Sequence, residues 1–198
     1  MNIGWTSTNN EDAIMQVKTD TRIVPMILAA LLALSFGAAI AAPTAGDAAP
    51  DFVLSDQYGE QHALADFKEQ WLLVFFYPKA DTPGCTTEAC NFRDNIYAIR
   101  AAGAEVVGIS VDSVADQKQF SDKYKLPFTL LSDNDGKVCD AYGVLRNYGV
   151  MEVASRQSFL IAPDGSIAKH YSKVSPETHT QDVIADLQRL TAAANTDS

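Results

Sequence analysis

From residue 71 onward, the apolar positions of the chain alternate between two periodicities. Continuous runs of strand-forming side chains, such as WLLVFFY and EVVGISV, predict buried strands over residues 71–77, 105–111 and, more briefly, 128–131. Apolar side chains at helical spacing predict helices over residues 84–101 and 113–125, and a helical turn over 137–142. Because strands and helices alternate along the chain, helices are expected to pack on the faces of a sheet that contains parallel strands.

The C-terminal part predicts a hairpin followed by a helix. Residues 158–162 and 166–171 are strand-forming, and the Pro163-Asp164-Gly165 segment between them has the composition of a tight turn. Pro176 opens a last helix with apolar side chains at helical spacing. The complete pattern predicts a thioredoxin-like α/β/α sandwich with a mixed central sheet over residues 51–198.

The N-terminal part, residues 1–41, has the pattern of a secretory signal peptide. Residues 23–42 carry no charge, follow Lys18 and Arg22, and end in small side chains where a signal peptidase would cut. Cleavage after Ala41 would leave residues 42–50 as a flexible lead-in. A start at Met15 would give a shorter leader.

This pattern predicts a periplasmic or otherwise exported protein without stable membrane association after cleavage. The alternative is a retained membrane anchor, because twenty apolar residues can span a bilayer. Pro25, Gly37 and the many alanines weaken that alternative. A cytoplasmic location is the remaining possibility.

Composition narrows the class of protein. The chain has 198 residues, of which 47% are hydrophobic and 20% charged, which fits one globular domain plus extra length. A net charge of −10 repels phosphate backbones and argues against nucleic-acid binding. Three cysteines are too few for a disulfide scaffold, and an odd number leaves at least one unpaired. These features predict a small acidic enzyme or binding domain.

Cys85 occupies a special position at the junction of the first buried strand and the following helix. Pro83 suits the first helical position and Thr82 suits the N-cap, so Cys85 falls in the first turn, where backbone N–H groups lack helical partners. The helix dipole favours a thiolate there by only about 0.3–1 kcal/mol. A predominantly ionised Cys85 therefore requires a further cation supplied by the fold.

The second cysteine, Cys90, is five residues further along the same predicted helix. In an ideal helix this spacing separates the Cα atoms by about 8.6 Å, whereas a disulfide needs them within about 7 Å. A redox pair would therefore require the helix to unwind in each cycle. The alternative is that both cysteines are small core side chains.

Residues 77–94 (YPKADTPGCTTEACNFRD) resemble the active-site motif of the peroxiredoxins, specifically the peroxiredoxin Q / bacterioferritin comigratory protein subfamily. The resemblance continues through Leu131-Ser132-Asp133, Tyr142-Gly143-Val144 and residues 156–161 (RQSFLI), and so covers nearly all of residues 47–192. It implies an atypical two-cysteine thiol peroxidase that uses no metal and no other cofactor.

The resemblance also implies roles for individual residues. Cys85 would be the peroxidatic cysteine and Cys90 the resolving one, joined in an intramolecular disulfide during turnover. Glu88 would orient the catalytic arginine, although an ordinary helix-start acid is an equal alternative. Arg156 would be the catalytic arginine that supplies the missing cation, Thr82 would bond the peroxide and the thiolate, and Pro78 would shield the pocket. The residues implied to bind substrate are Pro78, Thr82, Gly84 and Arg156.

The activity implied is reduction of hydrogen peroxide and organic hydroperoxides to water and alcohols, in antioxidant defence and redox homeostasis. The electron donor would be thioredoxin or a thioredoxin-like dithiol. An intramolecular pair needs no partner chain, which predicts a monomer. Two other functions stay open on the same fold: an exported thiol–disulfide oxidoreductase, which the missing C-x-x-C disfavours, and a redox sensor.

The remaining chemical groups carry weaker signals. Cys139 is expected to be a buried structural thiol. His62, His170 and His179 are scattered without metal-ligand spacing and are expected at the surface. Residues 145–155 look shorter than in many relatives, so the outer wall of the peroxide pocket is expected to differ.

Overall fold

The computed structural model describes Met1 and residues 42–194. Its larger sheet has seven strands in the order β2-β1-β5-β4-β3-β8-β9, and β6 and β7 form a separate two-stranded sheet. The strands are β1 (Val53–Asp56), β2 (Gln61–Ala63), β3 (Trp71–Phe76), β4 (Ala104–Ser110), β5 (Thr129–Ser132), β6 (Leu145–Asn147), β7 (Glu152–Ala154), β8 (Gln157–Ile161) and β9 (Ile167–Tyr171). The helices are η1 (Leu64–Phe67), α2 (Pro83–Ala101), α3 (Val114–Tyr124), α4 (Lys137–Ala141) and α5 (His179–Ala194).

The sheet is mixed, as the sequence predicts. Strands β3, β4 and β5 run parallel to one another, whereas β8 pairs antiparallel with β3 and with β9. At the other edge, β1 pairs antiparallel with β5 and β2. The carboxyl end of β3 therefore lies in the middle of the sheet, beside the start of β8.

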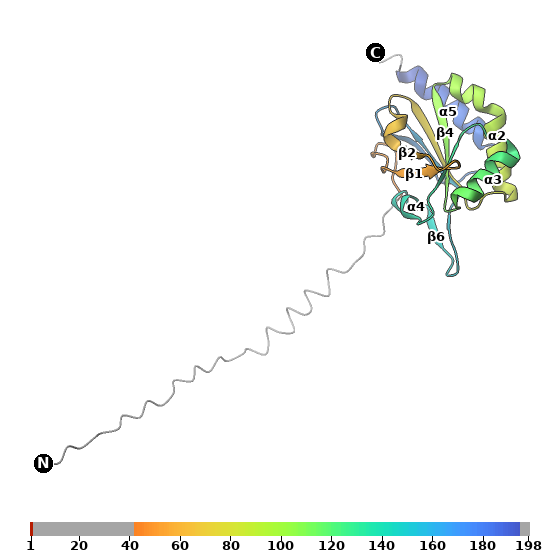
Figure 1. Cartoon of the computed structure of the whole chain (residues 1–198). Coiled ribbons are helices and arrows are strands. Elements are labelled where there is room, and N and C mark those ends of the chain that lie inside the picture. The colour runs from red at the N-terminus through yellow and green to blue at the C-terminus, as the bar shows by residue number, and fades with distance from the viewer. Residues whose placement is uncertain (2–41, 195–198) are drawn as a thin grey trace. The chain divides into compact units, whose positions relative to one another are not determined.

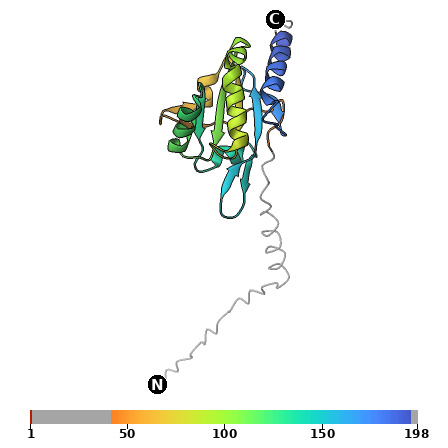
Figure 2. The same cartoon turned by 90° about the vertical axis from the view of Figure 1, so that its right-hand side faces the viewer.

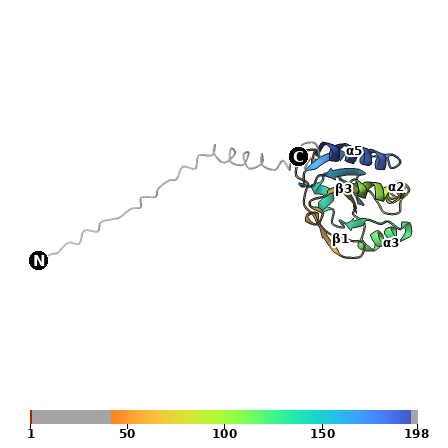
Figure 3. The ribbon, with the colours of Figure 1, turned by 90° about the horizontal axis from the view of Figure 1, so that it is seen from above.

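Strand β3 is continuously apolar because it is covered on both faces. Leu73 and Phe75 pack into one hydrophobic core, and Leu72, Val74 and Phe76 pack into the other. Helices α2, α3 and α5 lie side by side over the first face (Figure 3). Figure 2 turns this face toward the viewer, with α2 in yellow-green and α5 in blue. Helix α4 contributes to the second core.

The predicted strands, helices and hairpin are present with boundaries that differ by one to three residues. The sequence did not predict β1, β2, β6 or β7. These are short strands of three or four residues with several exposed positions, and they lack the long apolar runs of central strands. The β6–β7 hairpin extends away from the body of the domain (Figure 1).

Residues 42–50 differ from a simple flexible lead-in. Gly46 N donates to Ile167 O at 2.8 Å, Ile167 N donates to Asp47 O at 2.8 Å, and Ala49 N donates to Gly165 O at 3.0 Å. The backbone is thus attached to the β8–β9 hairpin before Asp51, where the sequence placed the start of the domain. The predicted signal peptide lies almost entirely outside the described residues. Within the described part, no helix is long and apolar enough to cross a membrane.

Candidate active site

The loop between β3 and α2 follows the carboxyl end of β3, a central strand of the sheet, and leads to the N-terminus of α2. Thr82 is the N-cap of α2 and Pro83 follows at the first position, as predicted. The Thr82 hydroxyl itself makes no capping hydrogen bond, however. It donates to Lys79 O at 2.9 Å instead, inside the loop.

A buried polar network holds this loop from the side of β4. The two carboxylate oxygens of Asp112 accept hydrogen bonds from Ala80 N at 2.7 Å and from Lys79 Nζ at 3.1 Å. Ser110 Oγ also donates to Asp112, at 2.8 Å, and accepts from Gln117 Nε2 at 2.9 Å. The loop is therefore anchored to groups that are themselves fixed.

Helix α3 holds the next residue of the loop. Asp81 has a left-handed backbone (φ 59°), which is uncommon for a residue other than glycine. Its carboxylate pairs with Lys123 Nζ at 2.6 Å and accepts a hydrogen bond from Tyr124 Oη at 2.6 Å. These contacts fix the chain just before α2 begins.

Cys85 is buried in the first turn of α2, with 1% of its surface exposed. Arg156, which directly precedes β8, donates from Nη2 to Cys85 Sγ at 3.2 Å. Gly84 permits this approach, since a Cβ atom there would lie 3.2 Å from Arg156 Nη2. The structure thus brings together Cys85, Gly84 and Arg156. Arg156 places a positive charge beside the sulfur, in addition to the helix dipole.

Glu88 lies directly behind Arg156. Its side chain is fully buried, and its Oε2 forms an ion pair with Arg156 Nη1. This geometry matches the interpretation that Glu88 orients the arginine, rather than the alternative of a helix-start acid. Burial raises the pKa of Glu88 to about 7, against the opposing attraction of Arg156. The second oxygen, Oε1, is buried and has no hydrogen-bond partner among the described residues.

His179 is a member of this site that the sequence analysis placed at the surface, and that expectation is wrong. The side chain is 1% exposed and its Nε2 lies 3.9 Å from Glu88 Oε1. The same nitrogen shares a hydrogen bond of 2.9 Å with Ser158 Oγ. Burial, and secondarily the charge of Arg156, lower the pKa of His179 to about 4, so the ring is neutral.

A signal for this burial was present in the sequence. His179 precedes Val183 and Leu187 at intervals of four residues, so it continues the buried face of α5. The other two histidines are half-buried: His62 Nε2 lies 3.2 Å from Asp56 Oδ2, and His170 stacks on Phe159 at 4.3 Å between ring centroids. In the described part of the chain, no cluster of side chains is suited to hold a metal ion.

The three cysteines are all unbonded. Cys85 and half-buried Cys90 both lie within the continuous α2 helix, so the pair is separated as the sequence predicts. Cys139 is fully buried in α4, which agrees with a structural thiol. Burial raises the pKa of the Cys139 thiol.

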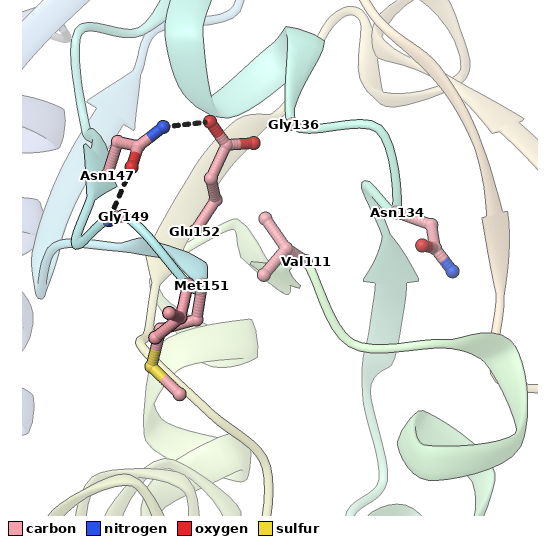
Figure 4. Close-up of a pocket in the computed structure, with 8 residues that line it drawn as sticks. Val111, Asn134, Gly136, Asn147, Gly149, Met151 and Glu152 are labelled. Carbon is pink, nitrogen blue, oxygen red and sulfur yellow. Dashed lines mark hydrogen bonds between the residues drawn. The ribbon is translucent and has the colours of Figure 1, made fainter.

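Pro78 is half-buried and lines a hollow between the active-site loop and the β6–β7 hairpin, together with Lys79, Asp112 and Met151. A neighbouring hollow, lined in part by the turn of the hairpin, shares Met151 and Glu152 with it (Figure 4). There, Asn147 Nδ2 donates to Glu152 Oε1 at 2.8 Å, and Gly149 N donates to Asn147 Oδ1 at 2.7 Å. Part of residues 145–155 therefore forms a wall near Pro78.

These features define a class of protein. The site has a reduced cysteine at a helix N-terminus, an arginine that contacts its sulfur and a second cysteine on the same helix. On a mixed sheet, this arrangement is typical of a thiol-based redox enzyme.

Comparisons with known proteins agree with this class. The AhpC/TSA family matches residues 45–170. "Peroxiredoxin Bcp" of Escherichia coli K12 is 46% identical over 139 residues, which are 68% of this chain and 89% of that protein. The chain belongs to this family of peroxiredoxins and to its peroxiredoxin Q / bacterioferritin comigratory protein subfamily. It is a thiol peroxidase, an oxidoreductase.

Solved structures confirm the thioredoxin-like fold. Peroxidoxin BcpB of Mycobacterium tuberculosis superposes with a TM-score of 0.70 at 35% identity, over 74% of this chain and 97% of that one. The bacterioferritin comigratory protein of Xanthomonas campestris, whose structures concern alkyl peroxide reduction activity, superposes with a TM-score of 0.66 at 34% identity. That match covers 71% of this chain and 92% of the X. campestris chain.

Proposed function

We propose that Cys85 is the peroxidatic cysteine of this peroxidase and that Cys90 resolves the oxidised form as an intramolecular disulfide. The observation that carries the proposal is the 3.2 Å contact between Arg156 Nη2 and Cys85 Sγ at the N-terminus of α2. A guanidinium on the sulfur stabilises negative charge that burial would otherwise disfavour. Among the described residues, the charged group that acts on buried Cys139 is instead the carboxylate of Asp133.

In the first step, the Cys85 thiolate attacks one oxygen of the peroxide and the O–O bond breaks. The departing oxygen takes up a proton and leaves as water or an alcohol, and the sulfur becomes a sulfenic acid. Arg156 remains fixed on the reacting sulfur because Glu88 holds its other nitrogen. Gly84 keeps the space in which the guanidinium lies.

In the second step, Cys90 attacks the sulfenic sulfur. An S–S bond forms, the S–O bond breaks and water is released. Both cysteines start within an intact helix, so the first turns of α2 have to unwind before the sulfurs meet. A dithiol then reduces the disulfide by thiol–disulfide exchange.

The proposed substrates are hydrogen peroxide and organic hydroperoxides. The alkyl peroxide activity attached to the X. campestris relative supports the second class. The hollow beside Pro78 also supports it, because Met151 and Val153 give one side of that hollow an apolar lining.

The proposed electron donor is thioredoxin or, outside the cytoplasm, a thioredoxin-like dithiol. Export after cleavage at Ala41 is supported by the uncharged segment at residues 23–42 and the basic residues before it. Cell fractionation with N-terminal sequencing of the recovered protein tests this. Recovery of an uncleaved chain from the cytoplasm would contradict export, and sedimentation velocity tests the proposed monomer.

Stopped-flow oxidation of the reduced protein by hydrogen peroxide tests the site. We expect a fast reaction that Cys85→Ser abolishes and Cys90→Ser retains, with a Cys85–Cys90 disulfide mapped by mass spectrometry in the unsubstituted protein. A rate no greater than that of a free thiol would refute the role of Cys85. A disulfide that instead includes Cys139 would refute the role of Cys90.

A further inference from the structure

The buried carboxyl group of Glu88 lies between a cation and a neutral ring. Its Oε2 pairs with Arg156 Nη1, and Arg156 Nη2 donates to Cys85 Sγ at 3.2 Å. Its Oε1 is buried without a hydrogen-bond partner among the described residues and lies 3.9 Å from His179 Nε2. Burying a carboxylate is costly unless its oxygens accept hydrogen bonds, so the side of Glu88 that faces His179 is poorly suited to carry a negative charge.

The His179 ring is held in a fixed position beside this carboxyl group. The residue is 1% exposed, and its ring makes edge-to-face contacts with Phe92 of α2, at 5.4 Å between ring centroids, and with Tyr171 of β9, at 5.0 Å. Phe92 lies one helical turn after Glu88, on the same buried face of α2. These contacts fix the ring nitrogen with respect to the carboxyl group.

Ser158 indicates which form of the nitrogen faces Glu88. Its Oγ lies 2.9 Å from His179 Nε2, and this is the hydrogen bond that the structure shows for the buried hydroxyl. A buried hydroxyl needs an acceptor for its proton, which makes Nε2 the acceptor and places the ring proton on Nδ1. A nitrogen lone pair beside Oε1 disfavours a carboxylate there, whereas it accepts a hydrogen bond from a carboxylic acid.

We propose that His179 is a positioning residue of the peroxidatic site: its Nε2 favours the carboxylic acid form of Glu88. This inference rests on the proposed function. With Glu88 neutral, the charge of Arg156 serves the Cys85 thiolate alone, whereas an ionised Glu88 would compete for the same guanidinium. The 3.9 Å between Oε1 and Nε2 is about 1 Å longer than a hydrogen bond, so a small rotation of the carboxyl group toward the ring completes the contact.

The titratable groups around the ring agree with this proposal. From β9, the Tyr171 hydroxyl donates to Asp186 Oδ2 at 2.9 Å, and Asp182, one turn along α5, is exposed. Burial raises the pKa of Glu88 to about 7, whereas burial and the charge of Arg156 lower the pKa of His179 to about 4. Between about pH 4 and pH 7, an uncharged acid therefore faces an uncharged ring.

Infrared spectroscopy of the reduced protein measures the proton on Glu88 directly. A carboxylic acid has a C=O stretching band that a carboxylate lacks, and the band that disappears in Glu88→Gln belongs to Glu88. Its intensity is followed from pH 5 to 9 in the parent and in His179→Phe, which keeps an aromatic ring and removes the nitrogens. His170→Phe is the matched control: His170 of β9 also stacks on an aromatic ring, and its Nε2 also bonds one side chain, Gln157 Oε1 at 2.7 Å.

We expect the Glu88 band of the parent to titrate with a midpoint at about pH 7. His179→Phe should lower this midpoint by about half a unit to one unit, because the acid loses one hydrogen bond. His170→Phe should match the parent. Ser158→Ala should raise the midpoint, because Nε2 no longer accepts from the serine and serves Glu88 alone.

Equal midpoints for His179→Phe and His170→Phe would overturn the proposal. A midpoint that rises in His179→Phe would also overturn it, because the ring would then stabilise the carboxylate instead of the acid. If His179→Phe fails to fold, Ser158→Ala decides, and a midpoint equal to or below that of the parent would contradict the proposal.

Stopped-flow oxidation by hydrogen peroxide tests the consequence for the sulfur. At pH 7, His179→Phe should be oxidised about threefold more slowly than the parent, because the thiolate shares Arg156 with an ionised Glu88. In the Glu88→Gln background the same substitution should cause no further change, since His179 acts through Glu88. Equal slowing in both backgrounds would show that the ring has a structural role only and would overturn the proposal.

The two measurements also separate this proposal from the one on which it rests. A lowered midpoint in a protein whose Cys85 does not react with peroxide would refute the proposed function and leave the Glu88–His179 interaction standing. A reactive Cys85 together with an unchanged midpoint in His179→Phe would refute the role of His179 and leave the proposed function standing.

Discussion

The buried carboxyl of Glu88 predicts an unusual dependence of stability on pH. Its side chain is fully buried, and burial raises its pKa to about 7 from an ordinary 4.5, although Arg156 opposes the shift. The folded protein therefore holds a proton on Glu88 over a range of pH in which the unfolded chain has released it. Replacing Glu88 with Gln keeps the shape and an oxygen that accepts from Arg156, but removes the titration.

The sign and size of the effect follow from this difference. Because the folded-state pKa is higher than the unfolded one, the contribution of Glu88 to stability is complete below pH 4.5 and is lost as the pH rises through about 7. At about 1.4 kcal/mol per unit, the complete loss is about 3 kcal/mol. Glu88→Gln mimics the protonated form. Its unfolding free energy relative to the parent protein should therefore increase as the pH rises, and it should be the more stable protein at pH 8.

Urea unfolding of both reduced proteins between pH 4.5 and 8.5 measures this difference. Subtracting the two curves cancels the other titrating groups, and Glu60→Gln, at an exposed carboxyl, serves as the control. A constant difference across the range would refute the reasoning. A Glu88→Gln protein that becomes progressively weaker with rising pH would show that the ion pair with Arg156 outweighs the cost of burying the charge.

Three further substitutions have defined expectations. His179→Asn removes a ring whose pKa is lowered to about 4 from 6.5. As the pH falls from 6.5 to 4, the unfolding free energy of the parent, measured in urea, should therefore drop by about 3 kcal/mol relative to the variant. Parallel curves for the two proteins would contradict this. Gly84→Ala places a Cβ atom 3.2 Å from Arg156 Nη2, so displacement of the guanidinium should slow peroxide oxidation by about tenfold in stopped-flow, and an unchanged rate would show that the site adjusts freely. Gly108→Ala places a Cβ atom 2.7 Å from the Phe75 ring and should lower the unfolding free energy by about 1–3 kcal/mol. An unchanged unfolding free energy would mean that the Phe75 side chain can move aside without cost.

The parts of the fold that follow from local pattern could be predicted from the sequence. The run at residues 71–77 predicts a strand covered on both faces, and β3 is buried from Leu72 to Phe76. Pro83 and Thr82 locate the start of α2 to the residue. The short edge strand β2 and the β6–β7 hairpin carry no comparable apolar periodicity, and their pairing depends on partners elsewhere in the chain.

The site itself depends on contacts between distant segments. The site combines Glu88 of α2, Arg156 at the start of β8 and His179 of α5. Their spacing along the chain does not predict that they lie close together. The resemblance to the peroxiredoxins identifies Arg156 as the catalytic arginine, whereas for Glu88 it leaves two equal interpretations. The position of His179 could have been inferred from its register with Val183 and Leu187, whereas its distance from Glu88 could not.

The two hydrophobic cores on opposite faces of the sheet also separate the thiols. Cys85 packs into the core under α2, and Cys139 packs into the core on the other side, with β3 and β4 between them. Unwinding of the first turns of α2 would expose Cys85 to its partner without opening the layer that holds Cys139. Within one chain, a disulfide between Cys139 and Cys85 would have to cross the seven-stranded sheet, so the architecture keeps Cys139 apart from the proposed redox pair.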